Sequence, residues 1–577
     1  MKKILMISLL LFVGPSFAGA PVVTPAVNAD LETFQDKLDN PQLVRFGVDG
    51  RVNMVYGYGY SNWSIIDGND GLVIVDAGWF IERSKQALAD FRKSQNNHKP
   101  IKAIIFTHMH ADHIAGVDGL FEAGEIENVD IYAQADWQKR LKYSAESGQM
   151  LMRRGMSQMG FLLPYKDLEK GTFGTGIGRE ALRGGTQSAT HMPTVSVDVS
   201  NENPGPVKTT IAGIPMEFYY APSDMDEQLL VWLPEDKVAL VGDALGGTLP
   251  YVITPRHEPE RKPESFLHTF KQILALDAEN VIPGHGRPLK GSADITAVVN
   301  SNYEVITFLH DQVRRYINLG YSADQIIDEV KLPPHLADNP DLQAHYHRLA
   351  WLIRGLYTNE AGWVQNINSL TQHTASEQAK RLIKLVGKDT MLAASAKAIE
   401  EKDYRWSISL SQMILDAEPN NTEARQLMIA GLRGVAYTTN SGAERNYVLS
   451  EAGTVAGVVN WDQIFTVVTG PRWKQRDAMA TFNQFGRRFQ SRQSYGQIFT
   501  VQFDVAGEGS FSFMVNDGVL LYEPVASDKA DSVINMDLDT VRSIGAKKLS
   551  LSEALQLEQT EITRGKNYAE IFGSLIQ

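Results

Sequence analysis

Residues 101–113 read IKAIIFTHMHADH, and this stretch decides the fold of the first half of the chain. Its first six residues form a short apolar run, typical of a buried strand, that leads directly into three histidines and an aspartate. Side chains that follow such a strand point into the crevice beyond the edge of the sheet. The cluster therefore predicts a metal site, with a satisfied, hydrogen-bonded histidine cluster as the alternative. Its members are His108, His110, Asp112 and His113.

The spacing H-x-H-x-D-H resembles the signature of the metallo-β-lactamase superfamily, and three later segments match the rest of that pattern. Asp224 lies in the segment PSDMDE, Asp243 closes an apolar run at 238–241, and His285 closes another at 281–282. The resemblance implies two zinc ions per chain, which share a bridging water as the hydroxide nucleophile. It places His108, His110 and Asp224 on the first ion, Asp112, His113 and His285 on the second, and Asp243 between them. Asp226 and Glu227 remain alternatives to Asp224.

Short apolar runs alternate with a helical pattern through residues 40–290. The runs at 72–75, 101–106, 229–233 and 238–241 suit buried strands, and a helix is expected from Ile81. The Pro234–Lys237 segment predicts a hairpin turn. Together these patterns indicate an α/β sandwich with mixed sheets. Residues 140–200 are rich in glycine and read either as a disordered excursion or, the interpretation we favour, as a loop over the site.

The rest of the chain changes character twice. Residues 292–450 follow a helical pattern, with paired helices around the segment 416–421 that resemble a tetratricopeptide unit. The last 115 or so residues predict strands, including a hairpin that turns at Asn516-Asp517-Gly518. This part reads as a small α+β domain.

Beyond the metal motif, nearly the whole chain resembles the secreted alkylsulfatases. The resemblance rests on Ser61–Ser64, the segment MLMRRG at 150–155, the surroundings of Tyr404 and Trp406, and the segment PNNTEAR at 419–425. It implies a multidomain protein: an αββα metallo-β-lactamase sandwich at 21–291, an all-α helical dimerisation domain at 292–452, and an α+β domain like sterol carrier proteins at 453–577. A homodimer follows from the same likeness.

The resemblance also implies a substrate, an alkyl sulfate ester such as dodecyl sulfate, cleaved to alcohol and inorganic sulfate. Arg256 lies thirteen residues after Asp243, where the family places a sulfate-binding arginine, although a surface arginine beside two glutamates is the alternative. We expect catalytic roles for Asp112 and Arg256, and substrate contacts from His345, His347 and Tyr357, for which ordinary packing is nearly as good an explanation. The methionine-rich segment 150–161 would contact the alkyl chain. Attack at carbon and attack at sulfur both remain open.

Two departures from the alkylsulfatase pattern keep other functions open. The family carries glutamate where Asp224 and Asp243 stand, and S-H-H-W-P where this chain has PGHGRP at 283–288. Within the hydrolases, the alternative substrate is another ester, a lactone or a phosphodiester. Outside them, the alternative is a lipid or surfactant binding protein that works through its C-terminal domain.

Composition limits the partners and the location. The net charge of −13 argues against nucleic acid, because phosphate binding needs clustered cations, and the absence of cysteine excludes thiolate ligands and disulfides. Residues 1–20 read as a cleavable signal peptide, with Lys2 and Lys3 before a ten-residue apolar run and an A-x-A site at 18–20. We therefore expect a periplasmic or secreted protein that begins near Pro21 and does not span the membrane.

Overall fold

The computed structural model describes residues 21–122, 124–140, 149–163, 174–178, 187–256, 258, 261–459, 461 and 477–577. The expected signal peptide and most of the glycine-rich segment lie outside these residues. The chain divides into two compact units, one that contains residues 150–459 together with the N-terminal part, and one formed mainly by residues 460–577.

Two sheets form the centre of the first unit. The first has the order β1-β2-β3-β4-β5-β6-β7 and the second the order β13-β12-β11-β10-β9-β8. The strands of the first sheet are β1 Gln42–Phe46, β2 Val52–Tyr56, β3 Trp63–Asp67, β4 Leu72–Val75, β5 Ile101–Ile105, β6 Asp130–Gln134 and β7 Val195–Val197. Those of the second are β8 Val207–Ile211, β9 Ile214–Tyr220, β10 Leu229–Leu233, β11 Val238–Leu240, β12 Asn280–Ile282 and β13 Leu289–Lys290. The predicted hairpin is confirmed, because β10 and β11 pair antiparallel.

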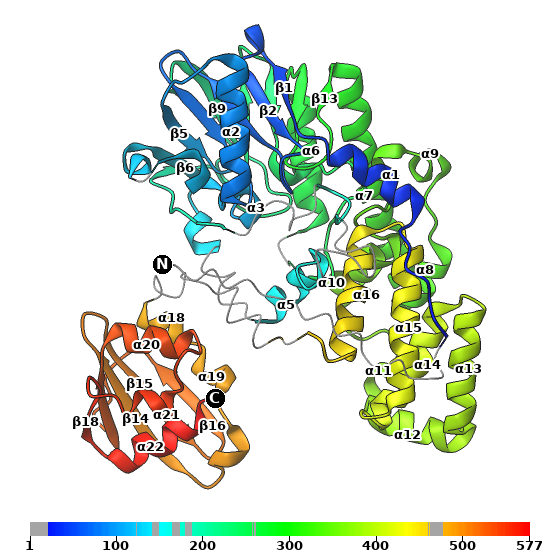
Figure 1. Ribbon diagram of the computed structural model, residues 1–577, viewed down its shortest axis with the longest axis vertical. Helices are drawn as coiled ribbons and strands as arrows, with labels where there is room; N and C mark the ends of the chain where they lie inside the picture. The colour runs from blue at the N-terminus through cyan, green and yellow to red at the C-terminus, as the bar shows by residue number, and fades with distance from the viewer. Residues whose placement is uncertain are drawn as a thin grey trace. The chain divides into compact units, whose positions relative to one another are not determined.

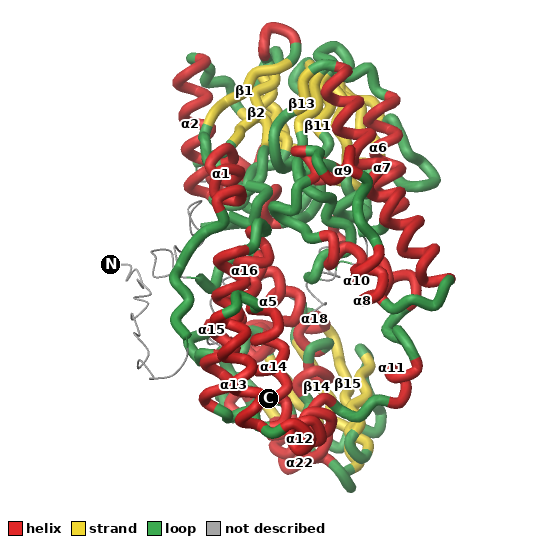
Figure 2. The backbone as a smooth tube through the Cα atoms, turned by 90° about the vertical axis from the view of Figure 1, so that its right-hand side faces the viewer, coloured by secondary structure: helices red, strands yellow, loops and turns green. Residues whose placement is uncertain are grey.

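Helices cover the outer faces of both sheets, which gives four layers (Figures 1 and 2). One apolar cluster contains side chains from both sheets and fills the space between them. A second joins the first sheet to α2 (Ile81–Gln95), which begins where the sequence predicts. A third joins the second sheet to α6 (Pro263–Ala275) and α7 (Ser292–Asn318). The predicted αββα sandwich is confirmed.

A group of helices completes the first unit. The helices α13 (Lys388–Glu400), α14 (Tyr404–Ala417) and α15 (Thr422–Thr438) pack around a shared apolar cluster. Asp403 and Asn421 begin the second and third of these helices by accepting backbone N–H groups, as expected of N-cap residues. The neighbouring helices are α8 Ala323–Glu329, α10 Leu349–Ala361, α12 Ala375–Val386 and α16 Gly442–Val455.

The second unit is a five-stranded sheet with helices, which confirms the α+β prediction for this part. The sheet order is β16-β15-β14-β17-β18, and the strands are β14 Ile498–Val505, β15 Gly509–Asn516, β16 Val519–Glu523, β17 Ser532–Met536 and β18 Glu561–Arg564. The helices α18 (Ala478–Phe482), α20 (Leu538–Gly545) and α22 (Lys566–Leu575) share an aromatic-rich core with the sheet. Asp517 and Gly518 both have positive φ, as the tight turn between β15 and β16 requires.

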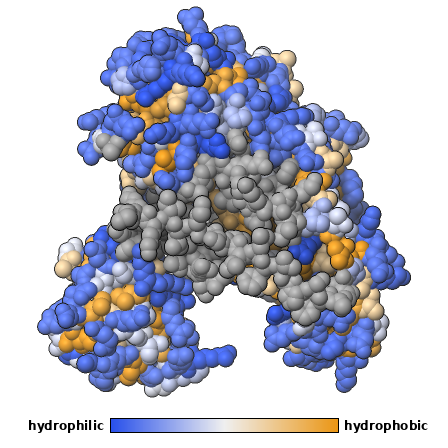
Figure 3. Space-filling view, viewed as in Figure 1, coloured by the Kyte–Doolittle hydropathy of each residue, from blue (hydrophilic) through white to orange (hydrophobic). Residues whose placement is uncertain are grey.

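On the face shown in Figure 3, hydrophilic residues cover most of the described surface and apolar residues gather in smaller patches. None of the helices formed by the described residues is long and apolar enough to cross a membrane.

Candidate metal centre

Loops that follow four strands bring the seven predicted ligands to one place between the two sheets. The loop after β5 carries His108 and His110 and runs into the short helix α3 (Ala111–Ile114), which carries Asp112 and His113. Asp224 follows β9, Asp243 follows β11, and His285 follows β12. All of these side chains are buried except that of His110, which is partly exposed.

The ligand atoms form two groups, and each group lies within 4.8 Å. The first consists of His108, His110, Asp224 and Asp243, and the second of Asp112, His113 and His285. Asp243 reaches both groups, because its Oδ2 lies 3.8 Å from His108 Nε2 and 3.2 Å from His285 Nε2. The arrangement therefore suits two ions that share Asp243.

The chemistry of these groups fits a pair of divalent cations. Imidazole nitrogens and carboxylate oxygens are the ligands expected for zinc when cysteine is absent. His113 Nε2 and Asp243 Oδ1 are buried 3.2 Å apart, yet neither makes a hydrogen bond. Buried polar atoms without a hydrogen bond are costly, and a metal ion would satisfy both.

A second layer of contacts fixes which nitrogen of each histidine faces the centre. Asp76 accepts a hydrogen bond from His113 Nδ1 at 2.8 Å and another from the Thr107 hydroxyl at 2.9 Å. That hydroxyl in turn accepts from His108 Nδ1 at 3.0 Å. His285 Nδ1 donates to a backbone carbonyl. These three histidines are thereby left with Nε2 for a metal. The sequence reasoning assigned no site role to Asp76, although an aspartate directly after a buried strand was the available signal.

Gly284 allows the chain to pass beside the centre. A Cβ atom at this position would overlap the carboxylate of Asp243 and would lie 2.8 Å from His113 Cε1. Only glycine leaves this space to the ligands.

Nearby carboxylates raise the pKa of some of the ligand histidines, so that these histidines are protonated when only protein groups surround them. Burial lowers the pKa of His110, but Asp224 and Glu258 outweigh it and raise the value to about 10. In the same way Asp243 and Asp112 overcome burial and raise the pKa of His285 to about 9. Burial and the neighbouring His113 instead lower the pKa of His108. A metal ion must therefore displace protons in order to bind.

The alternatives to Asp224 have other partners. Asp226 forms an ion pair with Arg140 at 2.5 Å. Glu227 is buried and accepts a hydrogen bond from the backbone N–H of Met109 at 3.1 Å. Burial raises the pKa of Glu227 to about 7. Asp224 alone of the three belongs to a candidate ligand group.

Two arginines lie beside the first group, joined by one carboxylate. Glu258 Oε2 is 2.9 Å from Arg256 Nη2 and 2.7 Å from Arg261 Nη2. Arg261 is also 2.6 Å from Asp224 Oδ1, and Glu258 Oε1 is 3.4 Å from His110 Nε2. The structure therefore brings Arg256 to the edge of the metal centre. The sequence reasoning missed Arg261 and the bridging position of Glu258, because a stretch so rich in charge reads as solvated surface.

Tyr346 was also missed. Its side chain is buried, contacts Tyr251 edge-on at 5.5 Å, and accepts a hydrogen bond from the amide of Gln158. Burial raises its pKa to about 12, although Arg256 and Arg261 act in the opposite direction. Its hydroxyl therefore stays protonated and can donate a hydrogen bond, and the ring of its neighbour Tyr251 lies 5.3 Å from the guanidinium of Arg261.

Of the other expected substrate residues, His345 and Tyr357 have partners elsewhere. His345 stacks on Phe34 and its Nε2 lies 3.0 Å from Asp30, so its side chain contacts α1 (Ala29–Leu38). His347 is buried; its Nδ1 donates to the carbonyl of the next residue, Arg348, at 3.0 Å, and its Nε2 makes no hydrogen bond. Tyr357 packs in the core beside α7 and donates to the carbonyl of Val364 at 3.2 Å.

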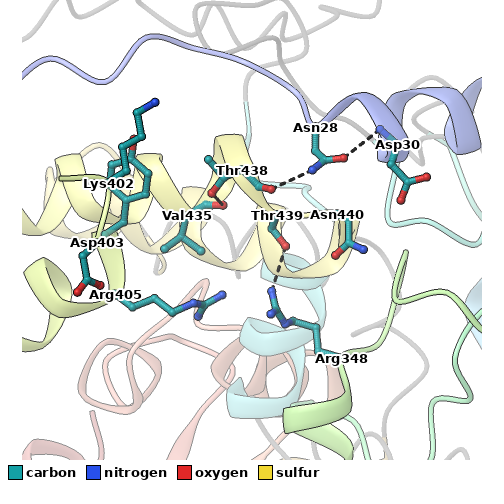
Figure 4. Close-up of a pocket in the computed structure, with 11 residues that line it drawn as sticks. Asn28, Asp30, Arg348, Lys402, Asp403, Arg405, Val435, Thr438, Thr439 and Asn440 are labelled. Carbon is teal, nitrogen blue, oxygen red and sulfur yellow. Dashed lines mark hydrogen bonds between the residues drawn. The ribbon is translucent and has the colours of Figure 1, made fainter. Parts of the chain in front are cut away.

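A separate cavity of about 470 Å³ lies in the helical part, where Arg348 and Arg405 approach the end of α15 (Figure 4). Both guanidinium groups pair with the buried Glu444. None of the seven candidate ligands lines this cavity.

Comparisons with known proteins identify the family. Residues 56–200 match the model of the metallo-beta-lactamase superfamily, and residues 322–457 match that of alkyl sulfatase dimerisation. A linear primary-alkylsulfatase of a Pseudomonas species is 31% identical over 409 residues, which are 69% of this chain and 74% of that protein. The chain belongs to the alkylsulfatase family.

Other alkylsulfatases extend the match to nearly the whole chain. An (R)-specific secondary-alkylsulfatase of Pseudomonas is 25% identical, over 92% of this chain and 80% of its own length. The solved structure of the stereoselective inverting sec-alkylsulfatase Pisa1 from Pseudomonas superimposes with a TM-score of 0.78 at 22% identity, covering 97% of this chain and 92% of that one. The multidomain fold of this alkylsulfatase-family chain is thus shared with a solved relative.

Proposed function

We propose that this chain is a two-zinc hydrolase that cleaves alkyl sulfate esters to an alcohol and inorganic sulfate. The observation that carries the proposal is a buried centre of histidine and aspartate ligands with Arg256 at its edge. The names of the related alkylsulfatases support the choice of substrate. The reaction consumes one water: the sulfate monoester anion and hydroxide give the alcohol and the sulfate dianion.

Metal bound at this centre would activate a water molecule for attack on the ester. When bound, a pair of divalent cations lowers the pKa of a shared water and neutralises charge on the ester oxygens. His108, His110 and Asp224 would hold one ion, Asp112, His113 and His285 the other, with Asp243 between them. Four imidazole ligands favour zinc.

The chain's own groups orient the ester. The planar guanidinium of Arg256 offers two parallel donors to a sulfate group. The hydroxyl of Tyr346 adds a neutral donor near the same place. Asp112 is the most exposed of the three carboxylates in the centre, at 12% of its side chain. Burial raises its pKa, but His113 and His285 outweigh burial and hold the pKa well below its usual range, so the carboxylate is ionised. It would accept the proton that the attacking water loses and pass that proton to the departing alcohol.

Aromatic side chains next to the centre suit the alkyl chain. Tyr60 contacts His285 at 5.2 Å between ring centroids and Trp79 at 5.6 Å. Trp79 in turn contacts Phe161, and both are only partly buried. In the methionine-rich segment, Met159 packs into this cluster, whereas Met150 is 55% exposed.

We further propose that the mature protein is exported and forms a homodimer. The export proposal rests on the signal-like sequence of residues 1–20. The homodimer is supported by the match of residues 322–457 to the dimerisation model.

A substrate panel tests the proposal. Purified protein with zinc is offered dodecyl sulfate, a long-chain lactone and an alkyl phosphodiester, and the His110→Ala variant is the control for metal-independent turnover. We expect sulfate release to be the fastest reaction and the variant to lack it. Faster turnover of the lactone or the phosphodiester, with dodecyl sulfate left intact, would reject the sulfate ester as substrate.

A further inference from the structure

Among the residues that the structure describes, Glu258 is the carboxylate that pairs with both arginines beside the metal centre without belonging to either ligand group. Its Oε2 lies within 3 Å of the guanidinium groups of Arg256 and Arg261, and its Oε1 lies 3.4 Å from His110. Its side chain is only 16% exposed, so solvent screens these contacts weakly. Two guanidinium groups at 2.9 and 2.7 Å pair with this carboxylate, and a buried ion pair of this kind requires the ionised form. Glu258 therefore carries a negative charge at the place where an anionic substrate would meet Arg256.

This charge changes the balance of the anion site. Arg256 and Arg261 contribute two positive charges, and Glu258 offsets one of them; Asp224, which also pairs with Arg261, is counted here with the metal ligands. An alkyl sulfate carries one negative charge, whereas inorganic sulfate and a phosphate monoester carry two near neutral pH. The electrostatic energy between Glu258 and a ligand grows in proportion to the charge of the ligand. A fixed carboxylate therefore repels a dianion about twice as strongly as a monoanion in free energy.

We propose that Glu258 is a specificity-determining residue that lowers the affinity of the site for dianions relative to monoanionic sulfate esters. The inference rests on the proposed function and deepens it in two ways. It weakens the binding of phosphate monoesters, which would compete with the substrate, and it weakens the binding of the sulfate dianion that the reaction releases. Specificity of this kind comes from a repulsive element rather than from an added contact.

A purely structural role makes a different prediction. If Glu258 only clamps the two arginines in position, its removal would disorder them and weaken the binding of every anion, whatever the charge. If its charge selects, removal strengthens the binding of all anions, and that of dianions most.

The test compares equilibrium binding of two unreactive anions, octane-1-sulfonate with one charge and inorganic sulfate with two. Calorimetry on zinc-loaded protein gives both affinities for the wild type and for Glu258→Gln, which keeps the shape and removes the charge. We expect octane-1-sulfonate to bind about tenfold more tightly to the variant and sulfate about a hundredfold. Glu258→Asp keeps the charge and is expected to keep the wild-type ratio of the two affinities.

Glu444→Gln is the matched control, because Glu444 also joins two arginines, Arg348 and Arg405, beside the cavity of Figure 4 and away from the ligands. It is expected to change neither affinity. Equal factors for the two anions in Glu258→Gln, or weaker binding of both, would overturn the proposal. Binding needs no turnover, so a wild-type protein that binds both anions but leaves dodecyl sulfate intact would refute the proposed function separately.

Discussion

Asp76→Asn would test whether the second layer of the centre sets metal affinity. Asp76 has a φ of 60°, a conformation that asparagine tolerates well, so the backbone is kept. One oxygen of Asp76 accepts from the backbone N–H of Thr107 at 2.8 Å, and the other accepts from His113 Nδ1 at 2.8 Å. An asparagine has only one oxygen for these two directions. Its NH₂ group must then face either the Thr107 N–H or His113 Nδ1. If the NH₂ group donates to His113 Nδ1, the histidine proton moves to Nε2, which is the nitrogen that would bind metal.

The loss of such a contact costs about 10- to 100-fold in metal affinity, which corresponds to about 1.4 to 2.7 kcal/mol. Competition with a chromophoric zinc chelator would measure it for the wild type and the variant. Asp118→Asn is the control, because Asp118 also pairs with a histidine, His191, outside the candidate ligand groups. Unchanged zinc affinity in Asp76→Asn, with the fold intact by circular dichroism, would show that Asp76 does not set the metal affinity of the centre.

Three further perturbations follow from the same geometry. Gly284→Ala would push a methyl group against Asp243. We expect the same competition assay to show at least about a tenfold loss of zinc affinity. Thermal unfolding of the metal-free variant is the control that the fold survives. The raised pKa values of His110 (about 10) and His285 (about 9) stabilise the metal-free protein fully below pH 6.5, the ordinary histidine value, and this contribution disappears as the pH rises through 9 to 10. Calorimetric scans should therefore show the metal-free Tm falling between pH 7 and 10 and the zinc-loaded Tm falling less; parallel curves would contradict this. Arg256→Lys keeps the charge but loses the paired donors. The KM for dodecyl sulfate should therefore rise about tenfold, while kcat changes much less. An unchanged KM would show that Arg256 does not bind the substrate.

Much of the fold was predictable because local patterns and tertiary packing agree. The runs at 72–75 and 229–233 are buried strands, since both faces of each sheet are covered. Ligands that follow strands at one edge of a sandwich must converge, so a few short motifs located the centre.

The parts that were not predictable depend on long-range partners. Arg261 stands in a stretch that reads as exposed, yet it is 1% exposed, because Asp224 and Glu258 meet it from either side. His345 and Tyr357 occupy plausible positions in the sequence, but helix packing turns one toward α1 and the other into the core beside α7. No local pattern records that Tyr346, between His345 and His347 in the sequence, packs against Tyr251 and accepts from Gln158.

We expect two metal ions at this centre to be needed for the release of sulfate. The most direct measurement titrates Zn²⁺ into metal-free protein and follows both bound zinc and the sulfate released from dodecyl sulfate. We expect no release without metal and full activity at two ions per chain. Full sulfate release by protein that holds no metal would contradict it.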